Sequence, residues 1–352
     1  MDFSTTLQEW YVANGRVLPW RGIDNAYYIW LSEVILQQTR VEQGRAYYER
    51  FISLFPTVND LAQASEREVL AAWQGLGYYS RARHLHQAAK QIAAMEAFPS
   101  DYATLRDLPG VGDYTASAVA SLAYNLPYAV VDGNVYRVLS RFFGMDDPID
   151  TTAGRSAFKR LATEVLDARH SATHNQALMD FGAMVCTPRA PRCADCPLHD
   201  ACAMIVSQRH PEDFPVRHRR VGITVRHFAY VFVVTPHHMM LHRRTERDIW
   251  QGLYEPLLYE PAEALPVAQL AQQVAQTFQL PPTDIVLEPT VSQMRHQLTH
   301  QLLLCDAYLL RCEEPTDLQL PAHYEWISLN QLEDYPIPRL IERLWHKTLQ
   351  AH

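Results

Sequence analysis

Lysine is scarce in this chain of 352 residues, because only Lys90, Lys159 and Lys347 among its 31 basic residues are lysines. Few side-chain amines are therefore available for covalent chemistry. No run of 18 apolar residues occurs, which excludes an ordinary transmembrane helix. The first residues include an acid and lack the basic segment of a secretory signal. These absences predict a cytosolic protein without membrane contact, located with the nucleoid if it is bacterial.

An excess of positive charge is also missing. The net charge of -8 argues against binding nucleic acid by electrostatic attraction alone. Residues 1–224 hold 22 basic and 24 acidic residues, whereas residues 225–352 hold 9 and 15, so DNA contacts are expected mainly in the first part. The chain is longer than one core usually supports, and its 48% hydrophobic and 20% charged residues indicate a folded protein of two or three domains.

The most informative stretch lies at residues 105–137. Leu108-Pro109-Gly110-Val111-Gly112 suits a tight hairpin, and an alanine-rich helical pattern begins directly after it at Asp113. A helix N-terminus offers unpaired N–H groups and a partial positive charge, and Gly110 and Gly112 would let a phosphate approach the backbone. The alternative is an ordinary turn before a helix.

A carboxylate follows this hairpin. The apolar run Tyr128–Val131 leads into Asp132-Gly133-Asn134, which places Asp132 beside whatever the hairpin faces. Pro-Gly-Val-Gly followed by Val-Asp-Gly-Asn-Val resembles the helix-hairpin-helix DNA glycosylases. In that family the hairpin grips the DNA backbone, and the aspartate lies against the sugar of an extruded base. The resemblance implies a mainly α-helical enzyme that acts on DNA.

A second carboxylate, Glu33, lies in the segment Tyr27–Arg40, which is apolar nearly all round and predicts a buried helix. Burial would raise the pKa of Glu33 and keep it protonated near neutral pH, as a general acid requires. The alternative is a structural glutamate hydrogen-bonded within the core. The motif Leu-Ser-Glu-Val-Ile-Leu-Gln-Gln-Thr resembles the same family almost letter for letter, and this implies that Glu33 is the catalytic acid.

Two glycines also frame an aromatic residue in Gly75-Leu76-Gly77-Tyr78-Tyr79. They predict a tight turn that presents the aromatic side chain, and Arg81 and Arg83 after it are placed to contact phosphates. The alternative is that the aromatics close a core. The resemblance implies that Tyr78, together with Gln38, wedges into the base stack and offsets part of the free energy of unstacking the flipped base.

Four of the six cysteines lie within 17 residues, separated by six, two and five residues: Cys186, Cys193, Cys196 and Cys202. Zinc ribbons usually pair two short knuckles far apart in sequence, so this compact loop suits a cubane cluster better than zinc. The spacing resembles that of the endonuclease III and MutY glycosylases, which implies a [4Fe-4S] cluster. Arg189 and Arg192 are placed to offset thiolate charge. Cys305 and Cys312 are predicted to be isolated thiols.

The chain beyond residue 224 predicts an α+β module, with strands over Val225–Val234 and Leu302–Leu310 and a helix near 264–279. The stretch from Arg243 to Tyr254 resembles the Nudix-like C-terminal domain of the MutY family. Nudix hydrolases hold magnesium through glutamates on the following helix, but residues 265–274 contain no carboxylate, so magnesium-dependent hydrolysis is not expected. The domain is expected to recognise DNA instead.

The family senses 8-oxoguanine with a Phe-Ser-His motif in this domain. The matching residues are Leu298-Thr299-His300, in which leucine replaces the aromatic residue and threonine keeps the hydroxyl group. The resemblance therefore implies that Thr299 and His300 contact the base opposite the adenine.

The predicted organisation is a helical catalytic domain, a linker and a Nudix-like domain. Within the first domain, residues 47–73 predict two helices split at Pro56, and helical patterns continue over 152–185. The basic linker either lies along DNA or is a solvated charge run. The predicted ranges are 1–215 for the catalytic domain (a six-helix barrel module at about 24–134 and an iron–sulfur module of 1–23 and 135–215), 216–224 for the linker and 225–352 for the Nudix-like domain.

The resemblance identifies the chain as a member of the MutY adenine DNA glycosylases, acting as a monomer on double-stranded DNA with adenine opposite 8-oxoguanine or guanine. Breaking an N-glycosidic bond leaves positive charge on the sugar and negative charge on the base, so one group must donate a proton and another must stabilise a cation. The resemblance implies that Glu33 is the acid, that Asp132 is the stabilising carboxylate and that Tyr114 and Asn134 orient them. It also implies that Gln176 contacts the flipped adenine, that Arg16, Trp20 and Tyr114 line its pocket, and that Arg21 is a further substrate-binding residue.

Two other functions stay open. An endonuclease III type pyrimidine glycosylase cuts the strand through a lysine Schiff base. Such enzymes place the lysine two residues after the second glycine of the hairpin, where this chain has Tyr114. A non-enzymatic iron–sulfur protein that binds DNA and senses redox state would need neither Glu33 nor Asp132.

Overall fold

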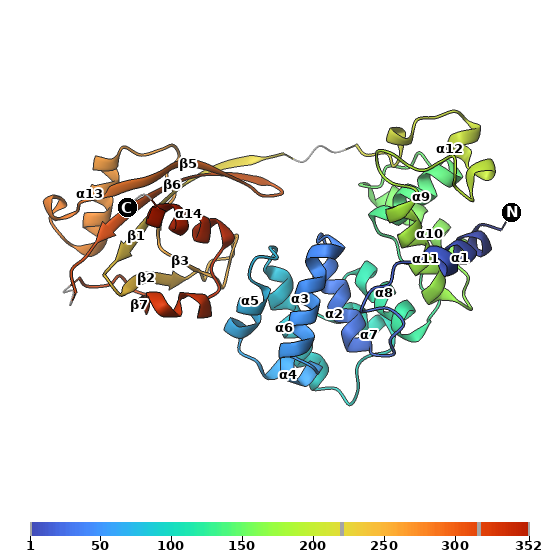
Figure 1. Ribbon diagram of the computed structural model, residues 1–352, viewed down its shortest axis with the longest axis horizontal. Coiled ribbons are helices and arrows are strands. Elements are labelled where there is room, and N and C mark those ends of the chain that lie inside the picture. The colour runs from blue at the N-terminus through green and yellow to red at the C-terminus, as the bar shows by residue number, and fades with distance from the viewer. Residues whose placement is uncertain (1, 219–221, 315–317, 351–352) are drawn as a thin grey trace. The chain divides into compact units, whose positions relative to one another are not determined.

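The structure is a computed structural model that describes residues 2–218, 222–314 and 318–350. The chain forms two compact units, Met1–Gln63 with His84–Arg220, and Ala64–Arg83 with Val221–His352 (Figure 1). Residues 219–221 of the predicted linker, including Arg219 and Arg220, lie outside the described residues. No helix in the described ranges is long and apolar enough to cross a membrane.

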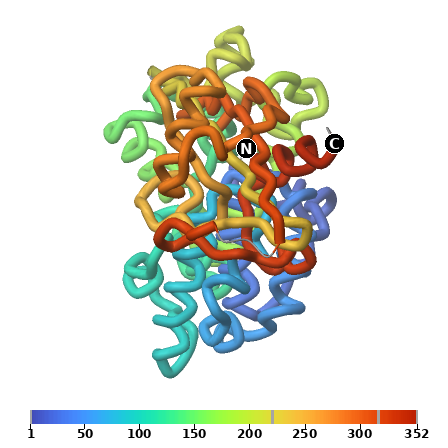
Figure 2. The backbone as a smooth tube through the Cα atoms, turned by 90° about the vertical axis from the view of Figure 1, so that its left-hand side faces the viewer, coloured from blue at the N-terminus to red at the C-terminus, as the bar shows by residue number. Residues whose placement is uncertain are grey.

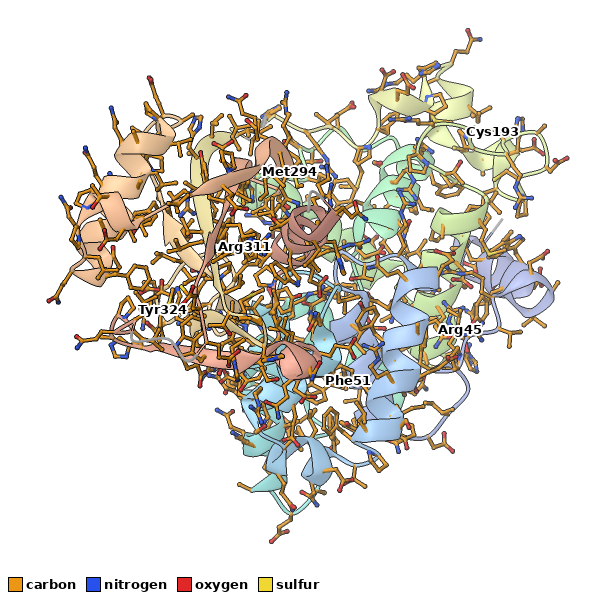
Figure 3. The ribbon with its side chains drawn as sticks, turned by 60° about the vertical axis from the view of Figure 1, so that its left-hand side comes forward. Arg45, Phe51, Cys193, Met294, Arg311 and Tyr324 are labelled. Atoms are coloured by element: carbon orange, nitrogen blue, oxygen red, sulfur yellow. The ribbon has the colours of Figure 1, made fainter. Side chains whose placement is uncertain are left out.

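The first unit is helical, as predicted. Its helices are short and are joined by capped turns, and α3 shows the usual division of faces, with Phe51 buried and Arg45 exposed (Figure 3). The helices of this unit, including α6, which begins in the second unit, are α1 Phe3–Asn14, α2 Ala26–Leu36, α3 Val41–Leu54, α4 Val58–Gln63, α6 Ser80–Ala93, α7 Tyr102–Asp107, α8 Asp113–Tyr124, α9 Gly133–Phe143, α10 Thr152–Glu164, α11 Ser171–Met184 and α12 Ala203–Val206.

Residues 47–73 form three helices rather than the predicted two. Besides α3 and α4, a separate helix, α5 Glu66–Trp73, begins at Ser65. Ser65 accepts a hydrogen bond from the backbone N–H of Glu68, and the Glu68 side chain accepts from the backbone N–H of Ser65. The hydrophobic periodicity alone would continue α4 into α5. The capping box marks where α5 begins as a separate helix.

The predicted buried helix is α2. Eight of its eleven residues are buried, including Glu33, and Asn25 caps its N-terminus by accepting from the backbone N–H of Tyr28. The predicted hairpin also precedes a helix, because α8 begins at Asp113 with Gly112 as its N-cap. Both predictions of local structure are therefore confirmed, and they place Glu33 and the hairpin on rigid elements.

The second unit is built on a mixed sheet with the strand order β3-β2-β1-β6-β5, in which β4 also pairs with β1 and β7 with β2. β1 and β6 are parallel, whereas the other pairs are antiparallel, and β5 and β6 run side by side in both views (Figures 1 and 2). The strands are β1 Thr224–Val234, β2 His238–Arg243, β3 Tyr254–Glu255, β4 Leu257–Tyr259, β5 Glu288–Gln297, β6 Gln301–Arg311 and β7 Tyr324–Ser328.

Two helices cover opposite faces of this sheet. Alternate residues of β1 pack with α14 Arg339–Gln350 on one side, and the residues between them pack with α13 Val267–Phe278 on the other. Burial on both faces explains why β1 is a nearly continuous apolar run. The two strands and the helix expected from the sequence are confirmed as β1, β6 and α13.

Residues 64–83 pack within the second unit. Glu66 forms an ion pair with Arg243 at 2.5 Å, and the Arg67 guanidinium lies over the Tyr335 ring, 5.4 Å from its centroid. The sequence places this segment in the first domain, so the packing units and the predicted domains divide the chain differently here. The domain boundaries stay a prediction.

Candidate functional site

A cavity of about 180 Å³ in the first unit, called the carboxylate cavity below, is lined by residues from α2, α8, α11 and the loops before α2 and α9. These segments are far apart in the sequence, and their packing brings two carboxylates to the same space. The lining contains eight of the predicted site residues: Arg16, Trp20, Arg21, Glu33, Tyr114, Asp132, Asn134 and Gln176.

Glu33 projects from α2 and is only 7% exposed. Burial raises the pKa of Glu33 to about 7, and the neighbouring Asp132 charge adds to this, whereas Tyr114 and Arg21 oppose it. The Tyr114 hydroxyl donates to Glu33 Oε2 at 2.9 Å. Burial also raises the pKa of Tyr114 far above its usual value, so this hydroxyl keeps its proton. Glu33 can therefore hold and release a proton near neutral pH.

Asp132 caps the N-terminus of α9. Its Oδ1 accepts from the backbone N–H of Val135, and its Oδ2 accepts from Asn134 Nδ2, both at 2.7 Å. Burial raises the pKa of Asp132, while these two hydrogen bonds act in the opposite direction. The carboxylate is thus fixed by two donors that favour its ionised form.

The loop that holds Asp132 lies very close to α11. A methyl group added at Gly182 would be 2.6 Å from Cβ of Asn134, so only glycine permits this approach. Asn134 also accepts from Arg137 Nη2 at 2.8 Å, and Arg137 donates to the carbonyl groups of Gly182 and Cys186. Helix packing and one buried guanidinium therefore set the position of Asn134.

Asp180 holds two arginines that line this cavity, Arg16 and Arg21, although it was not among the predicted site residues. Its carboxylate is fully buried and accepts from Arg16 at 2.5 Å and from Arg21 at 2.6 Å. Burial alone would raise the pKa of Asp180, but the hydrogen bonds from Arg21 and Arg16 hold it below its usual range. The two arginines are therefore structural partners of a buried anion as well as lining residues.

The remaining wall residues are also fixed. Trp20 is 6% exposed and packs edge-on against Tyr48, with the ring centroids 5.1 Å apart. Gln176 Oε1 accepts from the Tyr11 hydroxyl at 2.5 Å. Each side chain in this wall has a packed or hydrogen-bonded position, which preorganises the cavity.

The hairpin and Gln38 lie outside the described lining of this cavity. Gly110 has a φ of +73°, and a methyl group there would be 2.6 Å from Cβ of His84. Apart from the two chain neighbours of Gly112, no described residue has an atom within 4 Å of a methyl group added there. Gln38 is exposed after α2 with a φ of 56°. Packing and backbone conformation therefore explain why position 110 is glycine, but they do not explain the glycine at position 112.

The four clustered cysteines line one pocket together with Arg141. They come from the end of α11 and the loop up to α12, and Cys193 lies in that loop (Figure 3). Arg141 is 1% exposed and donates from Nη1 to Cys186 Sγ at 3.4 Å. In the described part of the chain, no three Cys, His, Asp or Glu side chains are grouped to hold a single metal ion. Four cysteine sulfurs at one pocket are the ligand set of an iron–sulfur cube, in which each cysteine binds a different iron.

Arg141 rather than Arg189 or Arg192 is the guanidinium that contacts a cysteine sulfur. Arg189 is exposed, and Arg192 borders the pocket but donates to the Met184 carbonyl. The basic residues between the cysteines were expected to offset thiolate charge. The structure assigns that contact to a buried residue of α9, which is distant in sequence.

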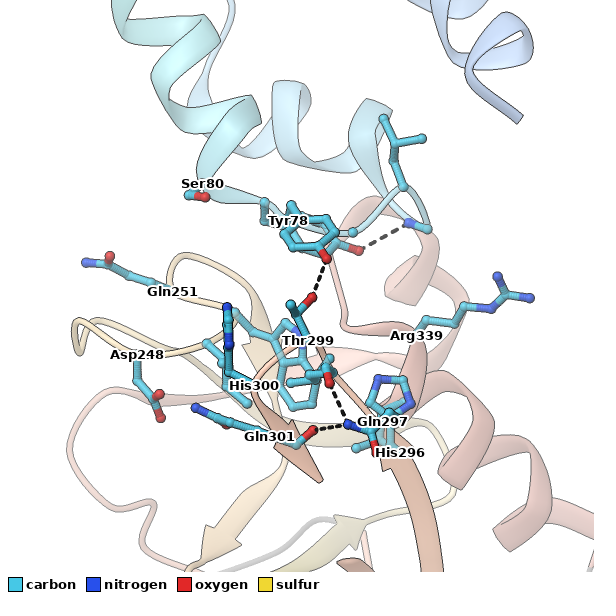
Figure 4. Close-up of a pocket in the computed structure, with 18 of the residues that line it drawn as sticks. Tyr78, Ser80, Asp248, Gln251, His296, Gln297, Thr299, His300, Gln301 and Arg339 are labelled. Atoms are coloured by element: carbon cyan, nitrogen blue, oxygen red, sulfur yellow. Dashed lines mark hydrogen bonds between the residues drawn. The ribbon is translucent and has the colours of Figure 1, made fainter. Parts of the chain in front are cut away.

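A second cavity, of about 490 Å³, lies within the second unit and is called the tyrosine cavity below (Figure 4). Tyr78, Thr299 and His300 line it, and the Tyr78 and Thr299 hydroxyl groups are 2.5 Å apart. Thr299 and His300 form the turn between β5 and β6, and Tyr78 is 47% exposed with a φ of 49°. Three more of the predicted site residues are therefore brought together here.

Three residues that shape these sites were missed by sequence reasoning. Asp180 follows Gln176 by four residues on α11, so helical spacing alone could have placed both on one face. Arg137 and Arg141 are likewise four residues apart on α9. Charged residues at this spacing usually indicate a solvated face, yet Arg137 is 8% exposed and Arg141 is 1% exposed.

Comparisons with known proteins extend over both units. Residues 31–163 match the HhH-GPD superfamily of base excision DNA repair proteins, and residues 229–347 match the NUDIX domain. An adenine DNA glycosylase of Buchnera aphidicola (subspecies Schizaphis graminum) is 32% identical over 255 residues, which are 72% of this chain and 73% of that protein. The adenine DNA glycosylase of the Acyrthosiphon pisum subspecies is 27% identical over 347 residues, covering 97% and 96%.

A solved structure supports the same fold. The structure of a thermostable thymine-DNA glycosylase has a TM-score of 0.54 and 28% identity, and the similarity covers 58% of this chain and 95% of that one. The chain therefore has a helical HhH-GPD glycosylase fold followed by a Nudix-like α+β domain with a mixed sheet.

Proposed function

Because the chain belongs to the adenine DNA glycosylase family and is a base excision repair enzyme, we propose that it hydrolyses the N-glycosidic bond of adenine opposite 8-oxoguanine or guanine in double-stranded DNA. The observation that carries the proposal is Glu33, with a pKa of about 7, lining the same cavity as Asp132. One group can donate a proton while the other stabilises positive charge.

In the proposed reaction, Glu33 donates its proton to the free imidazole-ring nitrogen of adenine as the bond between the sugar C1′ and adenine N9 breaks. The bonding electron pair leaves with the base, so the base departs as neutral adenine. Asp132 stabilises the cationic sugar, and water then adds to C1′ and gives a proton to one of the two carboxylates. The products are adenine and an abasic site.

The other residues of the carboxylate cavity position these groups. Tyr114 donates to Glu33 Oε2, which fixes the side chain of the acid. Asn134 donates to Asp132 and so orients the stabilising carboxylate. Trp20 supplies an apolar surface for the extruded base, and Gln176 supplies a polar contact from the wall that Arg16 and Arg21 support.

DNA is held by residues outside this cavity. The hairpin at Gly110 and Gly112 receives a phosphate at the N-terminus of α8. Gln38 and Tyr78 occupy the gap left by the flipped nucleotide, and both are exposed. Thr299 and His300, in the tyrosine cavity, contact the base opposite the adenine. The chain works as a monomer, in a bacterium at the nucleoid, with the domains 1–215 and 225–352 joined by residues 216–224.

The four cysteines suit a [4Fe-4S] cluster, because they line one pocket and a buried guanidinium meets Cys186. Cys186, Cys193, Cys196 and Cys202 would hold it. When bound, the cluster would offset part of the charge of the four thiolates and tie the loop between α11 and α12 into one unit. Arg141 also donates to the carbonyl groups of Thr187 and Pro188, so it fixes the loop backbone as well as the sulfur.

The test uses duplexes that carry adenine opposite 8-oxoguanine, guanine, cytosine or thymine, under single-turnover conditions. We expect strand breaks at adenine opposite the two purines, and only after treatment with alkali. Excision that ignores the opposing base would contradict the mispair specificity. Breaks without alkali, together with efficient trapping by borohydride, would show lyase chemistry instead.

A further inference from the structure

The orientation of the Gln176 side-chain amide decides what kind of base the carboxylate cavity accepts. A glutamine amide has an oxygen that accepts and an NH₂ group that donates, and the two ends have nearly the same shape. If the NH₂ end faces the cavity, it favours a base with an acceptor atom at that point. If the oxygen faces it, the preference is reversed.

Tyr11 of α1 holds one end of this amide. Its hydroxyl donates to Gln176 Oε1 at 2.5 Å. Burial raises the pKa of Tyr11, so the hydroxyl keeps its proton, although the Arg21 charge acts in the opposite direction. The described lining of the carboxylate cavity includes Gln176 but not Tyr11. Tyr11 therefore acts on the cavity through Gln176 and is a positioning residue.

Arg21 sets the direction of the Tyr11 hydroxyl. The guanidinium lies over the Tyr11 ring, 5.8 Å from its centroid, and its positive charge acts on the hydroxyl. A nearby cation attracts the lone pairs of the hydroxyl oxygen and repels its proton. The proton therefore points away from Arg21, in agreement with its donation to Gln176 Oε1.

A buried anion anchors the other end of this chain. Asp180 accepts from Arg21 Nη1 at 2.6 Å and from Nη2 at 2.8 Å. An ionised carboxylate can only accept and a guanidinium can only donate, so Asp180 fixes the Arg21 charge beside the Tyr11 ring. Reversing the amide would place its NH₂ group against the Tyr11 hydroxyl proton.

We propose that the chain Asp180, Arg21, Tyr11 and Gln176 fixes the amide with its NH₂ group facing the carboxylate cavity, where it donates to N1 or N3 of the extruded adenine. This inference rests on the proposed function, because it requires adenine to enter this cavity. It makes Tyr11 a specificity-determining residue, since the hydroxyl selects for a base that presents an acceptor nitrogen toward α11.

The test measures binding at the two ring nitrogens that Glu33 does not protonate. Duplexes carry adenine on a 2′-fluoro sugar, which resists cleavage, or its 1-deaza or 3-deaza analogue, in which one ring nitrogen is replaced by C–H. The unaltered protein is expected to lose about five- to tenfold in affinity for one of the two analogues, the size of one neutral hydrogen bond. Tyr11→Phe keeps the ring but removes the hydroxyl that holds the Gln176 amide. The difference in affinity between adenine and that analogue should therefore shrink to about twofold.

Tyr136→Phe is the matched control, because it removes a hydroxyl from a ring that packs on Phe158 in α10, away from the lining of the cavity. This variant should leave the ratio of the affinities for adenine and for the analogue unchanged. The inference is overturned if Tyr11→Phe gives the same ratio as Tyr136→Phe, or if no analogue weakens binding. The proposed function is overturned separately, if the unaltered protein fails to excise ordinary adenine from purine mispairs.

Discussion

The carboxylate cavity and the tyrosine cavity differ in how their side chains are held. In the carboxylate cavity, Glu33 and Asp132 lie on a buried helix and at a helix cap, and each accepts a hydrogen bond from a fixed donor. In the larger tyrosine cavity, Tyr78, Thr299 and His300 are exposed residues of turns. The first cavity holds its groups by packing and hydrogen bonds, whereas the second presents exposed side chains, of which Tyr78 and Thr299 contact each other.

This difference matches two different tasks. Proton transfer requires atoms held at fixed distances and groups with shifted pKa values, which only a buried and hydrogen-bonded site provides. Recognition of one base among several requires contacts that form only when that base is present. Changes in the carboxylate cavity should therefore reduce the rate for every substrate, and changes in the tyrosine cavity should alter the preference among substrates.

The largest effect is expected from Glu33→Gln. Glutamine has a similar shape but no proton to donate, so the single-turnover rate should fall about 10³-fold or more for adenine opposite either purine. In the unaltered enzyme the rate should fall about tenfold per pH unit above pH 7, because Glu33 has a pKa of about 7 and acts in its protonated form. A rate that stays constant between pH 7 and 9 would contradict this role.

The same substitution should raise stability at alkaline pH. The pKa of Glu33 is raised from its ordinary 4.5 to about 7 in the folded chain. The folded state therefore binds this proton more tightly, and stability is lost as the pH rises through about 7. The buried charge then destabilises the fold by at most about 3 kcal/mol, which Glu33→Gln removes. Thermal melting at pH 5 and pH 8 should show a gain for the variant only at the higher pH.

A smaller but still general loss is expected from Gly182→Ala. The added methyl group would be 2.6 Å from Cβ of Asn134, so α9 or α11 must shift, and Asp132 moves with it. We expect the rate to fall about 10- to 100-fold for all substrates, since small displacements of reacting groups have effects of this size. Gly133→Ala is the control, because its methyl group would have no described atom within 4 Å. Equal losses in the two variants would refute the packing argument.

Short motifs were sufficient to predict the family, the enzyme class and both fold classes, which the comparisons confirm. Local periodicity predicted α2, α8, β1, β6 and α13, because each is a long or strongly patterned segment. It did not predict β3, which has two residues, or β5, an edge strand that begins with Glu288-Pro289 and is largely exposed. Such strands are defined by their partners rather than by their own sequence.

Sequence reasoning was least successful where a charged residue is buried. Charged residues on a helix usually face solvent. Three of them are instead buried against groups more than 40 residues away in sequence: Asp180, Arg137 and Arg141. Their partners are carbonyl groups and side chains brought near by the packing of α9 and α11. Helical spacing could have placed Asp180 beside Gln176, but the buried partners of all three residues appear only in the tertiary structure, whereas Glu33 and Asp132 were found from motifs.

The tyrosine cavity should respond differently from the carboxylate cavity. Thr299→Ala removes the hydroxyl that contacts Tyr78, and His300→Ala removes a neighbouring lining residue. Together they should reduce the preference for 8-oxoguanine over guanine about tenfold, with the rate on adenine opposite guanine changed by less than about twofold. Thr283→Ala, in the turn after α13, is the control. An equal loss on both mispairs would show that this cavity acts on the reaction itself.

The smallest effect is expected at the hairpin, where two glycines can be separated. Gly110→Ala should lower the melting temperature, because Gly110 has a φ of +73° and its methyl group would be 2.6 Å from His84 Cβ. Gly112→Ala should leave the melting temperature unchanged, since apart from its chain neighbours no described residue has an atom within 4 Å of its methyl group.

If a phosphate approaches this backbone, Gly112→Ala should still weaken DNA binding about two- to fivefold. Because phosphate contacts carry no sequence information, the loss should be the same for both mispairs and for matched DNA. A loss confined to one mispair would place Gly112 in base recognition and remove the argument for a phosphate at the N-terminus of α8.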